Sequence, residues 1–176
     1  NIPRALALAQ IINKETNGRM QIQTPFQMIQ YWNLVRDPST YADTNSVSVF
    51  PKEGPNETLR KRVLDLIGKD SIETPILVAN LGVKKADNDY GFTFTESPDI
   101  QPTVTKAPFL QKDQRVKYDE KTNTLVPDEN GVQIYTATDQ SGLRGACRVR
   151  VGSVIFGDIV LLYSNSDGRV AFFYNP

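Results

Sequence analysis

The chain contains no histidine, and Cys147 is its only cysteine. Histidine is the side chain most often used to move protons near neutral pH, and it is the commonest metal ligand. Its absence excludes a Ser-His-Asp triad, a Cys-His pair and an ordinary zinc site. The sequence therefore points away from catalysis, and we expect no catalytic residue, no metal site and no cofactor.

A single cysteine cannot form a disulfide within the chain, which fits a reducing compartment, a virion or a fold that needs no bridges. Cys147 shares one face of a predicted strand with Val149 and Val151, whereas Arg148 and Arg150 share the other face. A cysteine in phase with valines is usually a small buried hydrophobic residue. We therefore favour a core position for Cys147 over a role as nucleophile.

Long hydrophobic runs and net charge are also missing. No apolar run approaches the ~20 residues that a membrane helix needs, and we find no secretory signal. Lys plus Arg number 20, as do Asp plus Glu, so the formal charge is zero. This balance argues against a protein that mainly coats nucleic acid or an anionic membrane. We expect a soluble protein of unknown compartment; residue 1 is Asn, which leaves open a processed, an engineered and an excerpted chain.

The first third of the sequence has helical periodicity. A first helix carries an apolar stripe at Ala5, Leu8, Ala9 and Ile12, and Asn17-Gly18 ends it. A second helix begins with a capping box at Thr24-Pro25-Phe26-Gln27, in which the Thr24 hydroxyl and the Gln27 side chain bind each other's backbone amides. A third helix is predicted from a cap at Asn56 to Gly68.

Strand patterns begin near residue 73 and continue to the end of the chain. The predicted strands are Ile76–Leu81, Phe92–Thr95, Arg115–Tyr118, Thr124–Val126, Val132–Thr138, Gly145–Val151, Val154–Tyr163 and Arg169–Tyr174, with a short candidate at Ser46–Phe50. Lys121-Thr122-Asn123 predicts a hairpin between the strands on either side of it, as does Asn130-Gly131, and the last three strands predict an antiparallel meander.

The 176 residues, 39% of them hydrophobic, fit a single α+β domain. About three helices in a helical layer (about 1–72) are predicted to pack on an antiparallel sheet of five to seven strands (about 73–176), which could also form a barrel or a sandwich.

Three arginines near the last strands are a candidate binding surface: Arg144, Arg148 and Arg150. Two of them on one strand face could bind a phosphate or a carboxylate. The alternative is a solvated strand face paired with acids such as Asp139 and Asp158, and we favour this alternative. No nucleic-acid motif accompanies the patch.

The second helix supplies a candidate protein interface: Phe26, Met28, Tyr31 and Trp32. Aromatic residues and methionine are enriched in interface hot spots, although at helical spacing they more often form core. Met28, Tyr31, Trp32 and Val35 form one apolar stripe. Phe26, Ile29 and Leu34 lie off this stripe, so the helix is apolar over much of its circumference and needs burial on several sides. This pattern favours a partner chain or self-association.

The leading hypothesis is a non-catalytic interaction or structural module of a larger assembly, with a virion or phage-type component as one version. The first alternative is a nucleic-acid-binding module that uses the three arginines. The second is a carboxylate- or metal-dependent hydrolase. Its only support is that some acidic residues lie close together in the sequence.

Overall fold

The protein is an α+β structure, as the sequence predicts. The computed structural model describes residues 2–22, 24–30, 41–98, 100–149, 153–158, 168–170 and 172–174. The helices are α1 (Ile2–Glu15), α2 (Pro25–Gln30), α3 (Glu57–Leu66) and the short 3-10 helix η1 (Pro108–Gln111). The strands are β1 (Met20–Ile22), β2 (Tyr41–Val49), β3 (Ile76–Ala79), β4 (Gly82–Lys85), β5 (Phe92–Thr95), β6 (Thr103–Lys106), β7 (Gln114–Asp119), β8 (Thr124–Pro127), β9 (Val132–Tyr135), β10 (Leu143–Val149), β11 (Ser153–Asp158), β12 (Gly168–Val170) and β13 (Phe172–Tyr174).

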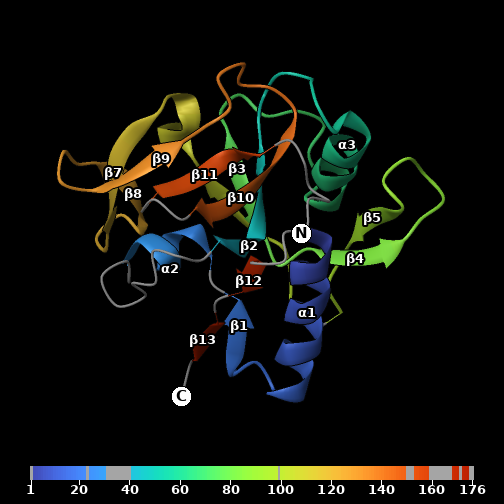
Figure 1. Cartoon of the computed structure of the whole chain (residues 1–176). Coiled ribbons are helices and arrows are strands. Elements are labelled where there is room, and N and C mark those ends of the chain that lie inside the picture. The colour runs from blue at the N-terminus through green and yellow to red at the C-terminus, as the bar shows by residue number, and fades with distance from the viewer. Residues whose placement is uncertain are drawn as a thin grey trace.

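One large sheet organises the molecule, with the strand order β6-β3-β2-β10-β11-β9-β7-β8 (Figure 1). Its pairs are antiparallel except for β9 with β11 and for β12, which lies parallel to β2. Two short antiparallel pairs, β1–β13 and β4–β5, complete the described strands. The predicted antiparallel sheet is therefore a mixed one.

The large sheet curls around an inner core. Side chains from one face of strands throughout the sheet meet in a single buried cluster, which α2 and η1 also enter. The inner cluster is Ile29, Phe50, Leu77, Ala107, Phe109, Leu110, Val116, Leu125, Ile134, Ala137, Ala146, Val154 and Phe156. The end strands β6 and β8 are not paired with each other in the described structure. The sheet therefore does not close into a barrel, which the sequence pattern also allows.

The other face of β2, β3 and β10 carries an outer core beneath α1, α3 and the β4–β5 hairpin (Figure 1). The outer cluster is Leu6, Val47, Val49, Leu59, Val63, Leu64, Ile76, Val78, Leu81, Phe92, Phe94 and Leu143. Val47 and Val49 of β2 face the outer cluster, and Phe50, the residue after the strand, faces the inner cluster. Because β2 lies inside the segment predicted as the helical layer, the N-terminal part supplies a central strand as well as helices.

Local signals for helix ends are confirmed at three places. The Thr24 Oγ1 accepts from the Gln27 amide at 3.2 Å, and the Thr24 amide donates to Gln27 Oε1 at 2.9 Å, which is the predicted capping box. Asn17 and Gly18 adopt positive φ after α1. Gly68, at φ +67°, ends α3 with bonds from its amide to Asp65 and from the next amide to Leu64, which form a Schellman motif.

The face that α1 buries differs from the predicted one. Ala5 is buried as expected, but Leu6 is 1% exposed, whereas Leu8 is 37% and Ile11 59% exposed. The helix packs its Leu6 side against the outer cluster, so Leu8 of the predicted apolar stripe faces solvent, while Ala9 and Ile12 are half-buried. None of the described helices is long and apolar enough to cross a membrane.

The predicted hairpin at Asn130-Gly131 is wrong, although the turn itself is present. The Gly131 amide donates to the Asp128 carbonyl at 3.0 Å, but the strands on either side of the turn do not pair with each other. Both pair instead with β7, where Val116 has Pro127 on one side and Val132 on the other. The turn therefore carries the chain across the end of β7.

The predicted C-terminal meander is correct for β10 and β11 only. Those two strands are antiparallel neighbours, with Cys147 opposite Ile155. Strand β12 joins β2 in parallel instead of continuing beside β11, and β13 pairs with β1. The edge of β11 that a meander would use is taken by β9, which comes earlier in the chain.

Candidate functional site

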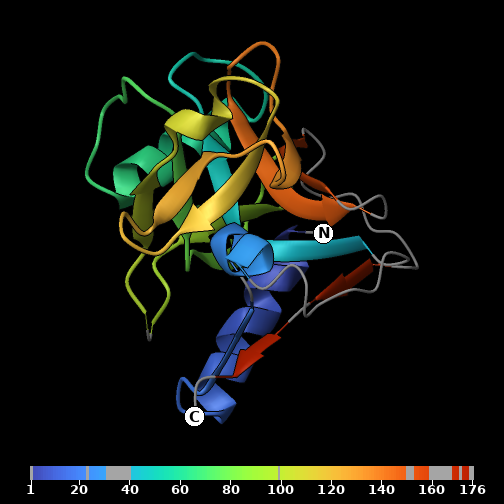
Figure 2. The same cartoon turned by 90° about the vertical axis from the view of Figure 1, so that its left-hand side faces the viewer.

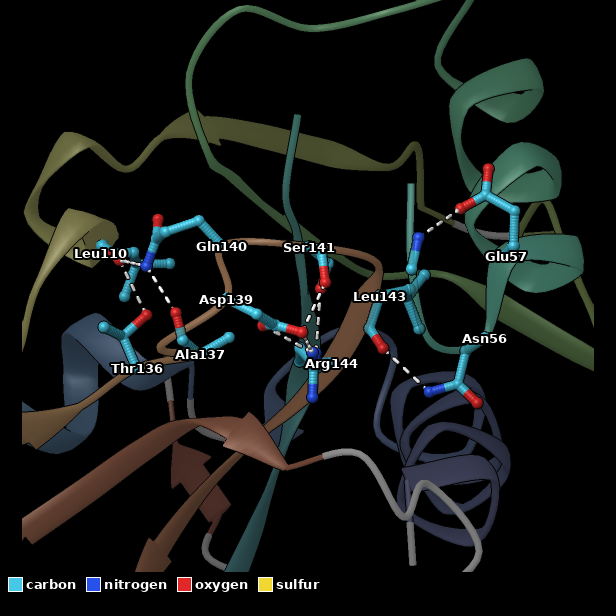
Figure 3. Close-up of polar contacts among 11 residues, drawn as sticks. Asn56, Glu57, Leu110, Thr136, Ala137, Asp139, Gln140, Ser141, Leu143 and Arg144 are labelled. Carbon is cyan, nitrogen blue, oxygen red and sulfur yellow. Dashed lines mark hydrogen bonds and ion pairs between the residues drawn. The ribbon is translucent and has the colours of Figure 1, made fainter. Parts of the chain in front are cut away.

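Arg144, one of the three candidate arginines, is buried near the start of β10 and is 3% exposed. Its Nε donates to the Ser141 carbonyl at 3.0 Å, and its Nη2 lies 2.8 Å from both Asp139 carboxylate oxygens (Figure 3). The Asp139 side chain is 50% exposed, so the ion pair runs from the protein interior to its surface. The guanidinium thus holds the loop that precedes its own strand.

The partner carboxylate is also held by a hydroxyl. Ser141 Oγ donates to Asp139 Oδ2 at 2.6 Å. This hydrogen bond, together with the positive charge of Arg144, holds the pKa of Asp139 below its usual value against the opposing effect of desolvation. A carboxylate with a lowered pKa is ionised at neutral pH and is a poor proton donor, so the arrangement is suited to an ion pair.

The same loop is joined backbone to backbone to the segment before α3. The Gly142 amide donates to the Lys52 carbonyl at 2.8 Å, and the Leu143 amide donates to the Pro55 carbonyl at 2.9 Å. The Asn56 side chain adds a bond to the Leu143 carbonyl at 2.9 Å (Figure 3). Asn56 has a left-handed backbone and no side-chain bond to the α3 amides, so its predicted capping role is replaced by this contact between loops.

Arg148 lies in β10 opposite Val154 and Ala42. Its side chain and the whole of Arg150 lie outside the described residues, as does the side chain of Cys147. The structure therefore places one of the three candidate arginines, and that one pairs with Asp139 inside the fold. A shared arginine surface stays a prediction.

Arg60 is a second buried arginine, and sequence reasoning missed it because Arg60-Lys61-Arg62 looks like a solvated basic run. It is 4% exposed. Its Nε donates to the Phe50 carbonyl at 3.0 Å, its Nη2 to the Pro51 carbonyl at 2.7 Å and its Nη1 to Glu57 at 3.0 Å. Arg60 therefore fixes the end of β2 to α3.

Of the two described members of the candidate interface, Met28 is buried and Phe26 packs against the inner core. Met28 is 3% exposed, and the half-buried Phe26 ring lies edge-to-face on Phe109 with centroids 6.0 Å apart. Tyr31 and Trp32 lie outside the described residues. The predicted interface on the second helix therefore stays a prediction.

Acidic clusters offer no alternative site in the described part of the chain. No group of three or more His, Cys, Asp and Glu side chains there is arranged to hold a metal ion.

A site whose described lining carries uncharged polar groups lies where the curl of the sheet stays open. It is a cavity of about 290 Å³ between α2, the β3–β6 edge and the turn between β7 and β8. Figure 2 views this side of the molecule, with α2 in blue beside the yellow strands. A second cavity, beneath α1, has a volume of about 20 Å³, enough for a single water molecule. Of these two cavities, only the first has room for a small organic ligand.

The described lining of the larger cavity combines polar and apolar side chains and carries no charged one. Helix α2 and its cap contribute Thr24, Phe26, Gln27 and Gln30, and the sheet edge contributes Ser46, Leu77, Ala79, Asn80, Thr103 and Thr105. Tyr118 and Asn123 complete it from the β7–β8 hairpin. Sequence reasoning found only Phe26 and the capping pair among these, because they come from segments far apart in the chain.

Comparison of the chain with models of known protein families, with curated proteins and with solved structures gives no match.

Proposed function

We propose that the chain is a non-catalytic interaction module of a larger assembly, which acts by binding a protein partner or a second copy of itself. A virion or phage-type component is one form that such an assembly would take. Arg60 and Arg144 are both held by contacts within the fold, so these buried arginines serve structure and do not argue for catalysis.

The observation that carries the proposal is the apolar outer face of α1. Leu8 and Ile11 lie three residues apart, on neighbouring turns, and are 37% and 59% exposed. Completing their burial stabilises a complex by about 1 kcal/mol for each side chain. This amount is small beside the cost of association, so a partner must cover more surface than this pair alone.

The test is the mass of the chain in solution over a range of concentrations, measured by light scattering. We expect a species larger than the monomer, or a complex with a co-purified partner, that dissociates in the Leu8→Glu and Ile11→Glu variants. Gln101→Glu, at an exposed loop position, adds the same charge and should change nothing. A monomer at every concentration, with no partner and no response to the α1 variants, contradicts the proposal.

A further inference from the structure

We propose that the cavity at the open side of the sheet binds a small, uncharged carbohydrate. This site is separate from the α1 surface, so the inference does not depend on the role in an assembly. It stands on three features of the cavity: its volume and position, the absence of charge in its described lining, and the orientation of its polar groups.

The volume and the position suit a compact ligand. At about 290 Å³, the cavity lies at the lower end of the range for small-molecule sites. It is formed where β6 and β8 remain unpaired, so the sheet supplies rigid walls on two sides and α2 a third. A ring-shaped molecule fills such a space better than an extended chain does.

The described lining carries no Asp, Glu, Lys or Arg side chain. A charged ligand would lose hydration there without gaining an ion pair, and that loss is large. Hydroxyl groups of a neutral ligand lose less, and the amides and hydroxyls of the lining both donate and accept hydrogen bonds. The lining thus selects for uncharged ligands rich in hydroxyl groups.

Several polar groups are already oriented by the protein. Ser46 Oγ donates to Asn45 Oδ1 at 3.0 Å, Asn45 Nδ2 donates to Asn80 Oδ1 at 3.1 Å, and Asn80 Nδ2 donates to Thr103 Oγ1 at 3.2 Å. Thr103 Oγ1 accepts the last hydrogen bond of this series, so its hydroxyl proton can be donated to a ligand. Fixing the groups before binding lowers the entropy lost on association.

Helix α2 repeats this arrangement on the opposite wall. Gln27 Oε1 accepts from the Thr24 amide, so its Nε2 remains able to donate. The side chains of Gln30 and Thr105 make no hydrogen bond within the part of the chain that the structure describes, and both line the cavity. They give a ligand one amide and one hydroxyl that the fold does not use.

Two aromatic side chains offer apolar surface for the carbon face of a sugar ring. Phe26 is anchored by edge-to-face packing on Phe109, which in turn packs on Phe156 with centroids 5.9 Å apart. Tyr118 donates its hydroxyl proton to Asn123 Oδ1, so its oxygen remains an acceptor. Pockets that combine such rings with a few placed polar groups are typical of small-ligand sites.

The test is a titration of the ¹⁵N-labelled chain followed by two-dimensional NMR, with the side-chain NH₂ signals of Gln27, Gln30, Asn80 and Asn123 as reporters. The probes are four neutral disaccharides: maltose, cellobiose, lactose and diacetylchitobiose. Glucuronate and glucose 6-phosphate serve as charged comparators, and a capped, uncharged tripeptide represents an extended chain. We expect at least one neutral disaccharide to shift the four reporters, and the charged sugars and the peptide to leave them unmoved.

Two variants locate the binding, and a third is the control. Gln30→Ala and Thr105→Val each remove one hydrogen-bonding group and should weaken binding about five- to tenfold. Thr93→Val makes the same change as Thr105→Val on β5, away from the cavity, and should leave the affinity unchanged. The backbone spectrum of each variant shows whether it is folded. If Gln30→Ala does not fold, Thr105→Val alone locates the binding.

The proposal is overturned if no neutral disaccharide shifts the reporters, or if the charged sugars or the peptide bind as well as the neutral sugars. Binding that Thr105→Val leaves unchanged overturns it too. A mass measurement that shows only monomers would contradict the assembly role but not this site, so the two failures are distinguishable.

Discussion

Replacement of Gly142 by alanine is expected to destabilise the protein far more than the same change at two other glycines with similar backbones. Gly142 has φ +76°, a left-handed conformation that costs an alanine about 1 to 2 kcal/mol. Alanine offsets about 0.4 to 1 kcal/mol of this cost, because it lowers the conformational entropy of the unfolded chain. The backbone alone therefore accounts for about 1 kcal/mol of lost stability.

The surroundings of Gly142 add the larger part. A Cβ there would lie 2.3 Å from the Pro55 carbonyl oxygen and 2.7 Å from the Pro55 nitrogen, so the two segments must separate by about 1 Å to reach ordinary contact. That movement stretches the Gly142–Lys52 and Leu143–Pro55 backbone bonds, which are worth about 1 kcal/mol each. We expect a total loss of about 3 kcal/mol, or a fall in melting temperature of about 6 to 12 °C.

Gly68 and Gly91 are the matched controls. Their φ angles are +67° and +70°, and a Cβ at either position would have no atom within 4 Å. Gly68→Ala and Gly91→Ala should each cost about 1 kcal/mol, measured from urea unfolding midpoints at a constant slope. If all three variants lose the same free energy of unfolding within about 0.5 kcal/mol, the contact between the two loops does not constrain position 142.

The buried arginines give two more predictions. Asp139→Asn should lower the free energy of unfolding by about 1 to 2 kcal/mol at pH 7, a modest figure because the carboxylate is half exposed. Since the pKa of Asp139 is lowered from 3.8 in the folded state, this stabilisation is present above the unfolded value and is lost as the pH falls through the folded one. Urea unfolding of both proteins should therefore converge on acidification, and a constant difference down to about pH 2 would contradict the ion pair. Arg60→Met should cost about 3 kcal/mol or more, because it removes the ion-pair partner of Glu57, which keeps only its bond from the Gly54 amide, and leaves two carbonyls unpaired. Lys61→Met should cost less than about 0.5 kcal/mol because its ion pair is exposed, and equal costs would refute the buried role of Arg60.

Features that depend on neighbouring residues could be predicted from the sequence. The Thr24–Gln27 capping box involves four consecutive residues, and both of its bonds lie within them. The same holds for the stop at Asn17-Gly18 and for the β7–β8 hairpin. The α+β class follows from the order of these local elements, and so it was predictable as well.

Strand pairing between distant segments could not be predicted in this way. The turn at Asn130-Gly131 specifies a reversal of the chain but not which strand the next segment joins. The hairpin prediction is wrong because β9, the strand after the turn, pairs with the edge of β7 that β8 does not use. Likewise, the alternation within β12 does not reveal that β2, more than a hundred residues earlier, is its partner.

The burial of Arg60 and Arg144 could not be predicted from the sequence, for a related reason. Arg60 adjoins Lys61 and Arg62 in sequence, which is the usual pattern of a solvated surface, and Arg144 precedes the alternating arginines at 148 and 150 of a predicted strand. Burial of each depends on carbonyl groups of a loop that the fold brings to it, at Ser141 for one and at Phe50 and Pro51 for the other. The sequence alone does not show where such loop carbonyls point.

The candidate carbohydrate site shows how local structure can produce a binding surface without a motif. Each polar group in its walls has a local reason to be there: Thr24 and Gln27 cap a helix, while Asn80 and Asn123 occupy turn positions with φ +62° and +51°. Threonine suits the exposed strand β6 because β-branched residues favour strands. In this chain each of these positions carries an uncharged side chain, so the polar groups in the described walls of the cavity are neutral. The chemistry of the site is therefore set by four separate pieces of local structure, and it becomes visible only when the curl of the sheet brings them together.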